Sequence, residues 1–345
     1  MVEFGGWHMP VQYSTIVEEH QAVRRGVGLF DVAHMGRIRF TGTDACRLLD
    51  RVLTNDVSKL TVGQVRYALV TNERGTVLDD VLVYRLPSSY LLVVNASNQE
   101  KILSWLDQHK DGFNATIENM ADSHAMLALQ GPKSVEVMRS LGCESALGLK
   151  YYSVQETTVA GRAAILSRTG YTGEDGFEII VPADGAAAFW DEVFVAGQTS
   201  GLVPTGLGCR DTLRLEAAMP LYGHELTESI DPLTAGLDFA VKLQKPEFIG
   251  LAALQAIANA GTTRQRVGLQ LVGRRIAREG AGVVCDGQTV GEVTSGTFSP
   301  TLEKAIAMAF VAKSVAEVGR AVEVDIRGKL EAATIVPLPF YHRTR

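Results

Sequence analysis

The sequence predicts an α+β protein of two to three domains with a small β-barrel at its C-terminus. Short helix and strand patterns alternate over residues 1–257, at a spacing that favours antiparallel hairpins over a doubly wound parallel sheet. After a small, polar stretch that reads ANAGTTRQR, short strand patterns follow one another between glycine-rich turns. The mixed helix and strand patterns before this linker, and the strand patterns after it, together predict the α+β class with a C-terminal barrel.

The elements of the first part follow from periodicity and caps. A helix is expected over Ile16–Arg24, and Ser14 or Thr15 provides its N-cap. Alternation with a period of two predicts a strand over Arg37–Phe40 and another over Val77–Leu86. Ser97 and Glu100 have the spacing of a capping box, which predicts a further helix.

From Val159 onward the chain repeats this mixed pattern of strands and a helix, and it then continues with strands alone. A strand, a turn and a second strand begin at Val159, and a helix over Ala186–Ala196 follows. The barrel strands are expected at Val267–Leu271, Gly282–Cys285, Thr289–Thr294, Met308–Val311, Ala321–Ile326 and Ala332–Val336.

Composition excludes several classes of protein. Hydrophobic residues make up 46% of the chain and charged residues 21%, which is typical of a globular protein. The net charge of −6 argues against a nucleic-acid partner, and no apolar run approaches the ~20 residues of a membrane span. The four cysteines are far apart and indicate reduced core residues of a cytoplasmic protein; they are Cys46, Cys143, Cys209 and Cys285.

Common catalytic motifs are missing from the sequence. It contains no GxGxxG and no GxxxxGK[ST], so a bound nucleotide is not expected. HExxH and GxSxG are also absent, and the seven histidines form no i, i+4 pair. We therefore expect no metal site.

The hairpin VLDDVLVYR carries the first unusual feature. With a period of two, Asp80 and Tyr84 share one face of the strand, and an even-length loop places Asn95 on the same face of the returning strand. A carboxylate, a phenol and an amide grouped in this way would orient a nitrogen-containing ligand. The alternative is that Asp79 and Asp80 cap a turn and that Tyr84 belongs to the core.

The second unusual feature is a glycine-rich segment with the sequence SRTGYTGEDGFE. Gly170, Gly173 and Gly176 predict a bent loop, in which Tyr171 offers a flat ring and Glu178 begins the next strand. A carboxylate there can accept two parallel hydrogen bonds from a flat heterocycle with a guanidine-like edge. The alternative is a glycine-rich hairpin with solvated acids.

The third feature is the segment GLGCRDTLRLE, where Arg210 lies in the first turn of a predicted helix. A helix N-terminus favours anions, so an arginine there is unusual. It reaches a ligand carboxylate or phosphate, or else it forms a buried structural ion pair.

Taken in order, six blocks resemble the glycine cleavage T-protein family over almost the whole chain. The blocks are FGGWHMPVQY, FDVAHMGRI, VLDDVLVYR, SRTGYTGEDGFE, GLGCRDTLRLEA and GEVTSGTFSPTL. The resemblance implies a three-domain ring around a central cavity, built from two α+β (ferredoxin-like) domains and the C-terminal β-barrel. It places the first domain at residues 1–38 and 137–224, the second at 39–136 and 225–257, and the barrel at 258–345.

The resemblance also implies an activity. Family members are aminomethyltransferases, which move the one-carbon unit from a lipoylated carrier, the H-protein, to tetrahydrofolate and release ammonia. By matching positions, Asp80 is the catalytic carboxylate, and the residues in contact with folate are Met35, Tyr84, Asn95, Tyr171, Glu178 and Arg210. Asp79 is expected to be structural only. Departures from the usual family pattern are His8, where Asp is common, and Phe239, where Trp is common.

Two alternative functions share the same fold. One is a folate-linked demethylase of small molecules. The other is a non-enzymatic folate protein that assists iron–sulfur clusters, whose cysteine-containing signature is replaced here by QKPEFIGL without a cysteine. For the carrier, a basic rim is the expected contact, and its candidates are Arg274, Arg275, Arg278, Arg343 and Arg345.

Overall fold

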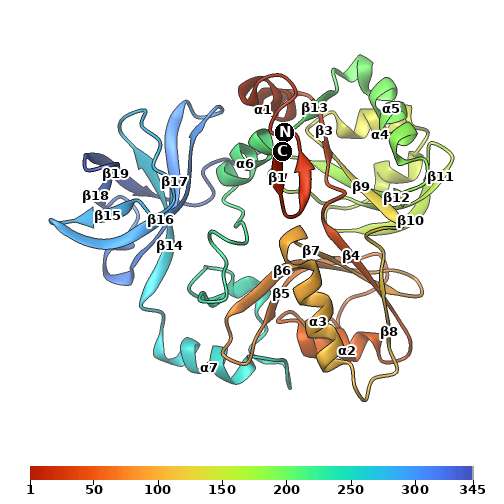
Figure 1. The fold of residues 1–345 in the computed structure, drawn as a ribbon, viewed down its shortest axis with the longest axis horizontal. Helices are drawn as coiled ribbons and strands as arrows, with labels where there is room; N and C mark the ends of the chain where they lie inside the picture. The colour runs from red at the N-terminus through yellow and green to blue at the C-terminus, as the bar shows by residue number, and fades with distance from the viewer. Residues whose placement is uncertain (344–345) are drawn as a thin grey trace.

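The computed structural model describes residues 1–343 as three bodies arranged in a ring (Figure 1). The first domain lies at the upper right of the view, the second at the lower right, and the barrel at the left. Helix α6 and the chain that follows it run between the barrel and the other two domains. The α+β fold with a C-terminal barrel is thereby confirmed.

The first domain is built on a six-stranded sheet that is antiparallel except for one parallel pair, β3 with β13. In spatial order its strands are β10 (Val154–Val159), β11 (Arg162–Ser167), β12 (Gly176–Pro182), β9 (His124–Gln130), β3 (Gly28–Asp31) and β13 (Val203–Thr205). Its helices are α1 (Ile16–Arg25), α4 (Ser134–Ser140), α5 (Ala186–Gly197) and α6 (Leu207–Glu216). Apolar side chains of α4 and α5 bury one face of the sheet, and those of α1 and α6 contribute to the core on the other.

The second domain has a five-stranded antiparallel sheet. Its strands in spatial order are β5 (Val65–Thr71), β6 (Val77–Arg85), β7 (Tyr90–Val94), β4 (Gly36–Thr41) and β8 (Thr116–Asn119). Helices α2 (Ala45–Val52) and α3 (Gln99–His109) pack on one face. Helix α7 (Leu251–Ala260) and the chain before it pack against Leu69 and Val77 of the same sheet.

The third domain is a closed barrel of six strands, as the regular strand spacing predicts. In order around the barrel they are β14 (Arg264–Leu271), β17 (Lys304–Ala312), β16 (Gln288–Ser299), β15 (Gly282–Cys285), β18 (Ala321–Asp325) and β19 (Leu330–Val336). Small and branched side chains fill its interior, among them Ala305, Ala307 and Ala309 on β17.

Sheet pairing corrects two of the expected domain boundaries. Strand β9 pairs with β3 and β12, so residues 124–130 belong to the first domain and not to the second, which was expected to extend to residue 136. Strand β4 begins at Gly36, two residues before the expected boundary at 38. Strand β9 is apolar on both faces, so its sequence alone does not reveal which sheet it joins. Strand β4 alternates Arg37 and Arg39 with Ile38 and Phe40, a pattern that identifies a strand but not its partners.

The helix caps agree with expectation at one helix and differ at another. Thr15 caps α1, and its hydroxyl accepts a hydrogen bond from the backbone N–H of Glu18 at 3.2 Å. The capping box predicted at Ser97 is wrong, because the chain passes through a single 3₁₀ turn over Ala96–Asn98 before α3 begins at Gln99. Asn95 before that turn and Asn98 at its end both donate hydrogen bonds to Asp79, which holds the segment against β6.

A buried ionic cluster fastens the first domain to the barrel. Arg24 of α1 contacts Glu216 of α6 at 2.8 Å and Glu174 at 3.0 Å. Glu216 also accepts hydrogen bonds from Ser299 and Thr301, which lie where β16 turns into β17. Burial opposes the negative charge of Glu216, but His20 and Arg24 outweigh it and hold the pKa of this carboxyl at about 2.

The chain begins with a two-stranded hairpin, β1 (Val2–Phe4) and β2 (Trp7–Met9), which points toward the centre of the ring (Figure 1). Its aromatic residues are partly exposed, Trp7 at 45% and Phe4 at 37%. Phe4 meets His34 edge to face, with 5.5 Å between ring centroids. Among residues 1–343, no helix has the length and hydropathy of a bilayer span.

Candidate functional site

A cavity of about 390 Å³ lies where the three domains meet. Strands β5 and β6 of the second domain, the glycine-rich loop and α6 of the first domain, and Arg266 of the barrel all contribute to its walls. Six of the predicted site residues line this one cavity: Met35, Asp80, Asn95, Tyr171, Glu178 and Arg210. Segments that are far apart in the sequence therefore converge on a single site.

Asp80 is held on the cavity wall by hydrogen bonds to both carboxylate oxygens. The hydroxyl of Tyr67 donates to its Oδ2 at 3.1 Å, and the side-chain amide of Asn95 donates to its Oδ1 at 2.8 Å. Burial raises the pKa of Asp80 above the ordinary aspartate range, and these two hydrogen bonds oppose that rise. The carboxylate is thus fixed in direction while its charge is poorly solvated.

Tyr84 does not line the cavity, which corrects the expectation that it contacts the ligand. It is fully buried in a cluster that joins the two α+β domains, together with Phe30 and Met126 of the first domain. Tyr84 shares a strand face with Asp80, but the first domain covers the sheet at this position. The alternative considered for the sequence, a core tyrosine, is the correct one.

Glu178 lies on β12 and faces the cavity from the first domain. Thr169 donates a short hydrogen bond to its Oε2, and the hydroxyl of Tyr84 lies 3.5 Å from the same oxygen. Burial raises the pKa of Glu178, while the Thr169 hydrogen bond and the positive charge of Arg210 act in the opposite direction. Glu178 is thus a buried acceptor with no direct ion pair to an arginine among residues 1–343.

The glycine-rich loop is rigid because its glycines pack tightly. A Cβ at Gly170 would lie 1.9 Å from the side chain of Gln130, and one at Gly176 would lie 2.5 Å from it. Gln130 also donates to the carbonyl of Thr169 at 3.0 Å. Its amide side chain therefore fills the space inside the bend of the loop. Of the three loop glycines, only Gly173 has a positive φ, +80°.

Tyr171 and Arg210 form one wall of the cavity. The Tyr171 hydroxyl donates to the carbonyl of Pro220 at 2.5 Å, which fixes the ring. The guanidinium of Arg210 lies over that ring, 4.7 Å from its centroid. Burial lowers the pKa of Arg210, and Tyr171 and Glu178 partly offset this effect.

The buried ion pair considered as the alternative for Arg210 occurs one turn later on α6. There Arg214 contacts Glu225 at 2.8 Å, and both side chains are almost completely buried. Arg210 is therefore left facing the cavity, where an anionic group of a ligand is its natural partner.

Sequence reasoning missed several cavity residues. Tyr67 lies on the strand beside Asp80, and its only signal is that β5 pairs with β6. His34 is buried beside Arg210; burial first, and then the charges of Arg210 and Arg37, lower its pKa to about 3, so its imidazole is neutral. Phe239, a departure from the usual family pattern, stacks on Tyr67 with 5.8 Å between ring centroids.

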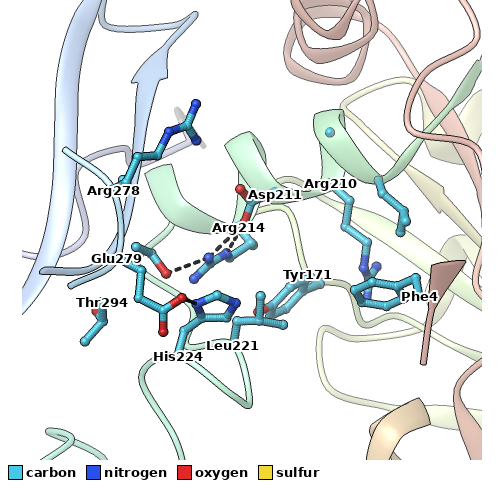
Figure 2. A pocket seen from close by; sticks show the side chains of 14 residues that line it. Phe4, Tyr171, Arg210, Asp211, Arg214, Leu221, His224, Arg278, Glu279 and Thr294 are labelled. Atoms are coloured by element: carbon cyan, nitrogen blue, oxygen red, sulfur yellow. Dashed lines mark hydrogen bonds and ion pairs between the residues drawn. The ribbon is translucent and has the colours of Figure 1, made fainter. Parts of the chain in front are cut away.

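A second cavity of about 460 Å³ adjoins the first between α6 and the barrel. The two share Phe4, Tyr171, Arg210, Leu221 and His224 on their walls. Figure 2 shows Arg278 and Glu279 of the barrel on the side of this space opposite Phe4 and Arg210. His224 contacts Glu279 at 3.1 Å across the gap between the domains.

The basic residues expected on the rim do not act as one group. Arg274, Arg275 and Arg278 border a groove of about 640 Å³ on the barrel, where Arg275 contacts Glu331 at 3.2 Å. Arg343 contacts Asp175 of the first domain at 3.7 Å, and Arg345 lies outside the described residues. Within residues 1–343, no group of three or more His, Cys, Asp or Glu side chains is arranged to hold a metal ion.

The fold and the cavity define a three-domain protein with a central cavity that two carboxylates face from different domains. Residues 1–245 match the family described as the GCVT N-terminal domain, and residues 264–342 match the glycine cleavage T-protein C-terminal barrel domain. The chain therefore belongs to the glycine cleavage T-protein family and is an enzyme of the aminomethyltransferase class.

Individual relatives agree over nearly their whole lengths. The chain is 49% identical to an aminomethyltransferase of Moorella thermoacetica over 346 aligned residues, which cover 100% of this chain and 94% of that protein. It is 45% identical to the aminomethyltransferase of Bacillus subtilis, with 99% and 95% covered. The crystal structure of the glycine cleavage system aminomethyltransferase T of Bartonella henselae superposes with a TM-score of 0.93 at 34% identity, covering 99% of this chain and 93% of that one.

Proposed function

We propose that this enzyme transfers the one-carbon unit of an S-aminomethyl-dihydrolipoyl carrier to tetrahydrofolate, giving 5,10-methylenetetrahydrofolate and ammonia. The observation that carries the proposal is the pair of carboxylates, the half-buried Asp80 and the buried Glu178, that face one cavity from different domains. The family membership supplies the reaction class, and the carboxylate acceptors of the cavity fit a ligand that carries several N–H donors.

In this proposal Glu178 binds the edge of the pterin. A pterin presents two neighbouring N–H donors, and a carboxylate accepts such a pair with two parallel hydrogen bonds. Met35 and Tyr171 supply apolar and aromatic walls, and Arg210 faces the anionic end of the folate. The volume of about 390 Å³ lies within the usual range for cofactor-sized ligands.

Asp80 is the proposed catalytic carboxylate. The C–S bond to the carrier and the C–N bond to the departing ammonia break, and two C–N bonds to N5 and N10 of the folate form. The two protons lost from N5 and N10 go to the carrier sulfur and to the leaving amine. A fixed carboxylate stabilises the positive charge that develops on the one-carbon unit and orients the folate nitrogens, with no covalent bond to the protein.

The carrier in this proposal is a lipoylated H-protein, whose arm enters the space between the domains. Arg278 lines the second cavity and Arg274 lies with it on the adjoining barrel groove, so both supply positive charge that steers an acidic carrier toward this face. We place the enzyme in the cytoplasm, where its four free cysteines would remain reduced.

The proposal is tested by calorimetric titration with tetrahydrofolate, followed by turnover with an aminomethyl-loaded lipoyl carrier. We expect one folate per chain, and stoichiometric formation of methylenetetrahydrofolate and ammonia. Binding without turnover would favour a small-molecule demethylase or a folate-binding assistant protein. Absence of folate binding would contradict the proposed function altogether.

A further inference from the structure

Asp79, the neighbour of the proposed catalytic residue, is completely buried and does not line the cavity. On β6 it points to the opposite face of the sheet from Asp80, because successive side chains of a strand alternate. A buried aspartate requires hydrogen-bond partners, and which partners it has decides what it does.

In the described part of the chain, the side-chain hydrogen bonds of Asp79 all come from the segment that follows β7. Its Oδ2 accepts from the backbone N–H of Asn95 at 3.0 Å. Its Oδ1 accepts from the side-chain amides of Asn95 at 2.8 Å and Asn98 at 2.6 Å. Burial first, and then the charge of Asp80, raise the pKa of Asp79, and these three N–H groups act in the opposite direction.

Asn95 links the two aspartates directly. Its side-chain nitrogen lies 2.8 Å from Oδ1 of Asp79 and 2.8 Å from Oδ1 of Asp80. An amide nitrogen carries two hydrogens, so one is available for each carboxylate. Asp79 therefore fixes the rotation of the same amide group that holds Asp80 on the cavity wall.

We propose that Asp79 is a positioning residue for the reaction, which acts through Asn95 to hold the Asp80 carboxylate in its reactive orientation. This inference rests on the proposed catalytic function of Asp80. It assigns to Asp79 and Asn98 a function beyond packing, since Asp79 anchors Asn95 and Asn98 in turn anchors Asp79.

The substitution Asp79→Asn tests this arrangement. An asparagine keeps the volume, but its own amide would face the N–H donors of Asn95 and Asn98, so it cannot accept all three hydrogen bonds. We expect kcat to fall about 10- to 100-fold, because a small displacement of a catalytic group has effects of this size, while the Kd for tetrahydrofolate changes less than about 3-fold. Asn98→Ala, which removes only one donor, should lower kcat by a smaller factor.

A double-mutant cycle separates positioning from general stability. In the Asp80→Asn background, Asp79→Asn should reduce the residual turnover by less than about 2-fold, because the group it positions is already gone. Leu48→Ala is the matched control, since Leu48 is buried in the same domain on α2 and has no contact with the cavity. It should lower the unfolding midpoint and leave kcat unchanged.

Two results would overturn the proposal: wild-type kcat in Asp79→Asn, or the same fold-loss in both backgrounds of the cycle. Absence of turnover in the wild-type enzyme would instead contradict the proposed function. The proposal would then be decided by crystal structures of wild type and Asp79→Asn. A displaced Asn95 amide and Asp80 carboxylate would support it, and unchanged positions would refute it.

Discussion

Tyr67 donates a hydrogen bond to Oδ2 of Asp80 at 3.1 Å and at the same time stacks on Phe239. The tyrosine lies on β5 and the aspartate on β6, so the contact crosses two paired strands. Together with Asn95 on the other carboxylate oxygen, Tyr67 leaves Asp80 little freedom to rotate. The orientation of the carboxylate is therefore set by the protein before any ligand binds.

Removal of the Tyr67 hydroxyl should change the pH dependence of turnover. Burial raises the pKa of Asp80 and the Tyr67 hydrogen bond lowers it, so Tyr67→Phe raises that pKa further. Because the ionised carboxylate is the active form, the acid limb of the kcat profile should move to higher pH. At pH 7.5 we expect kcat to fall about 3- to 10-fold.

The measurement is kcat between pH 5 and 9 for wild type and variant, with Tyr90→Phe as the control. Tyr90 is also a strand tyrosine of the second domain, but it packs in the core beneath α2 and α3. An acid limb that stays in place in Tyr67→Phe would contradict the assignment of Asp80 as the titrating group.

Glu178→Gln should weaken folate binding more than it slows the chemical step. Glutamine keeps the shape of the side chain but replaces one acceptor oxygen with a donor. The Kd for tetrahydrofolate, measured by calorimetry, should rise about 10- to 100-fold, the usual cost of a lost hydrogen bond to a charged group. Thr169→Val, which removes the hydroxyl that supports Glu178, should raise the Kd by a smaller factor. Equal affinity in Glu178→Gln and wild type would exclude the pterin contact.

The ionic cluster between the first domain and the barrel makes stability depend on pH in a defined direction. The pKa of Glu216 falls from 4.5 to about 2 on folding, so its ionised form stabilises the folded state above pH 4.5. This stabilisation, on the order of 3 kcal/mol, is lost as the pH falls from 4.5 toward 2.

We expect Glu216→Gln to lower the free energy of unfolding at pH 7 and to flatten its dependence on pH in the acid range. Urea unfolding at several pH values measures both effects. Glu279→Gln is the control, because its contact with His224 is largely exposed and should contribute at most about 0.5 kcal/mol. A pH dependence in Glu216→Gln equal to that of wild type would contradict the cluster as its source.

Charge reversal on the barrel tests the docking of the carrier. Arg274→Glu together with Arg278→Glu should raise the KM for the loaded carrier about 10-fold and leave the Kd for folate nearly unchanged. In the wild-type enzyme, added salt should slow turnover with the carrier in the same selective way. Equal losses in carrier turnover and in folate affinity would contradict electrostatic steering.

Much of the fold follows from local sequence patterns. The barrel is recognisable because its strands and glycine-rich turns recur regularly, although only three of its six pairings join consecutive strands. Strand β9 escapes such reasoning, since its sequence is apolar on both faces and its partners, β3 and β12, lie far away in the chain. Long-range pairing of this kind is decided by tertiary packing.

In the candidate site too, local sequence patterns predict some contacts and long-range packing decides the others. Asp80 and Asn95 were grouped correctly because one hairpin joins them, so strand alternation and loop length suffice. Tyr84 obeys the same alternation, but a second domain covers its part of the sheet, and no local pattern reveals that cover. The partner Tyr67 depends on the pairing of β5 with β6, which sequence spacing leaves open.

The most direct test of the account compares Asp80→Asn with wild type in kcat and in folate affinity. Asparagine preserves the volume and removes the charge, so we expect kcat to fall about 100- to 1,000-fold, with less than about 3-fold change in the Kd for tetrahydrofolate. Turnover at the wild-type rate would show that the charge of Asp80 takes no part in the reaction and would contradict the central claim.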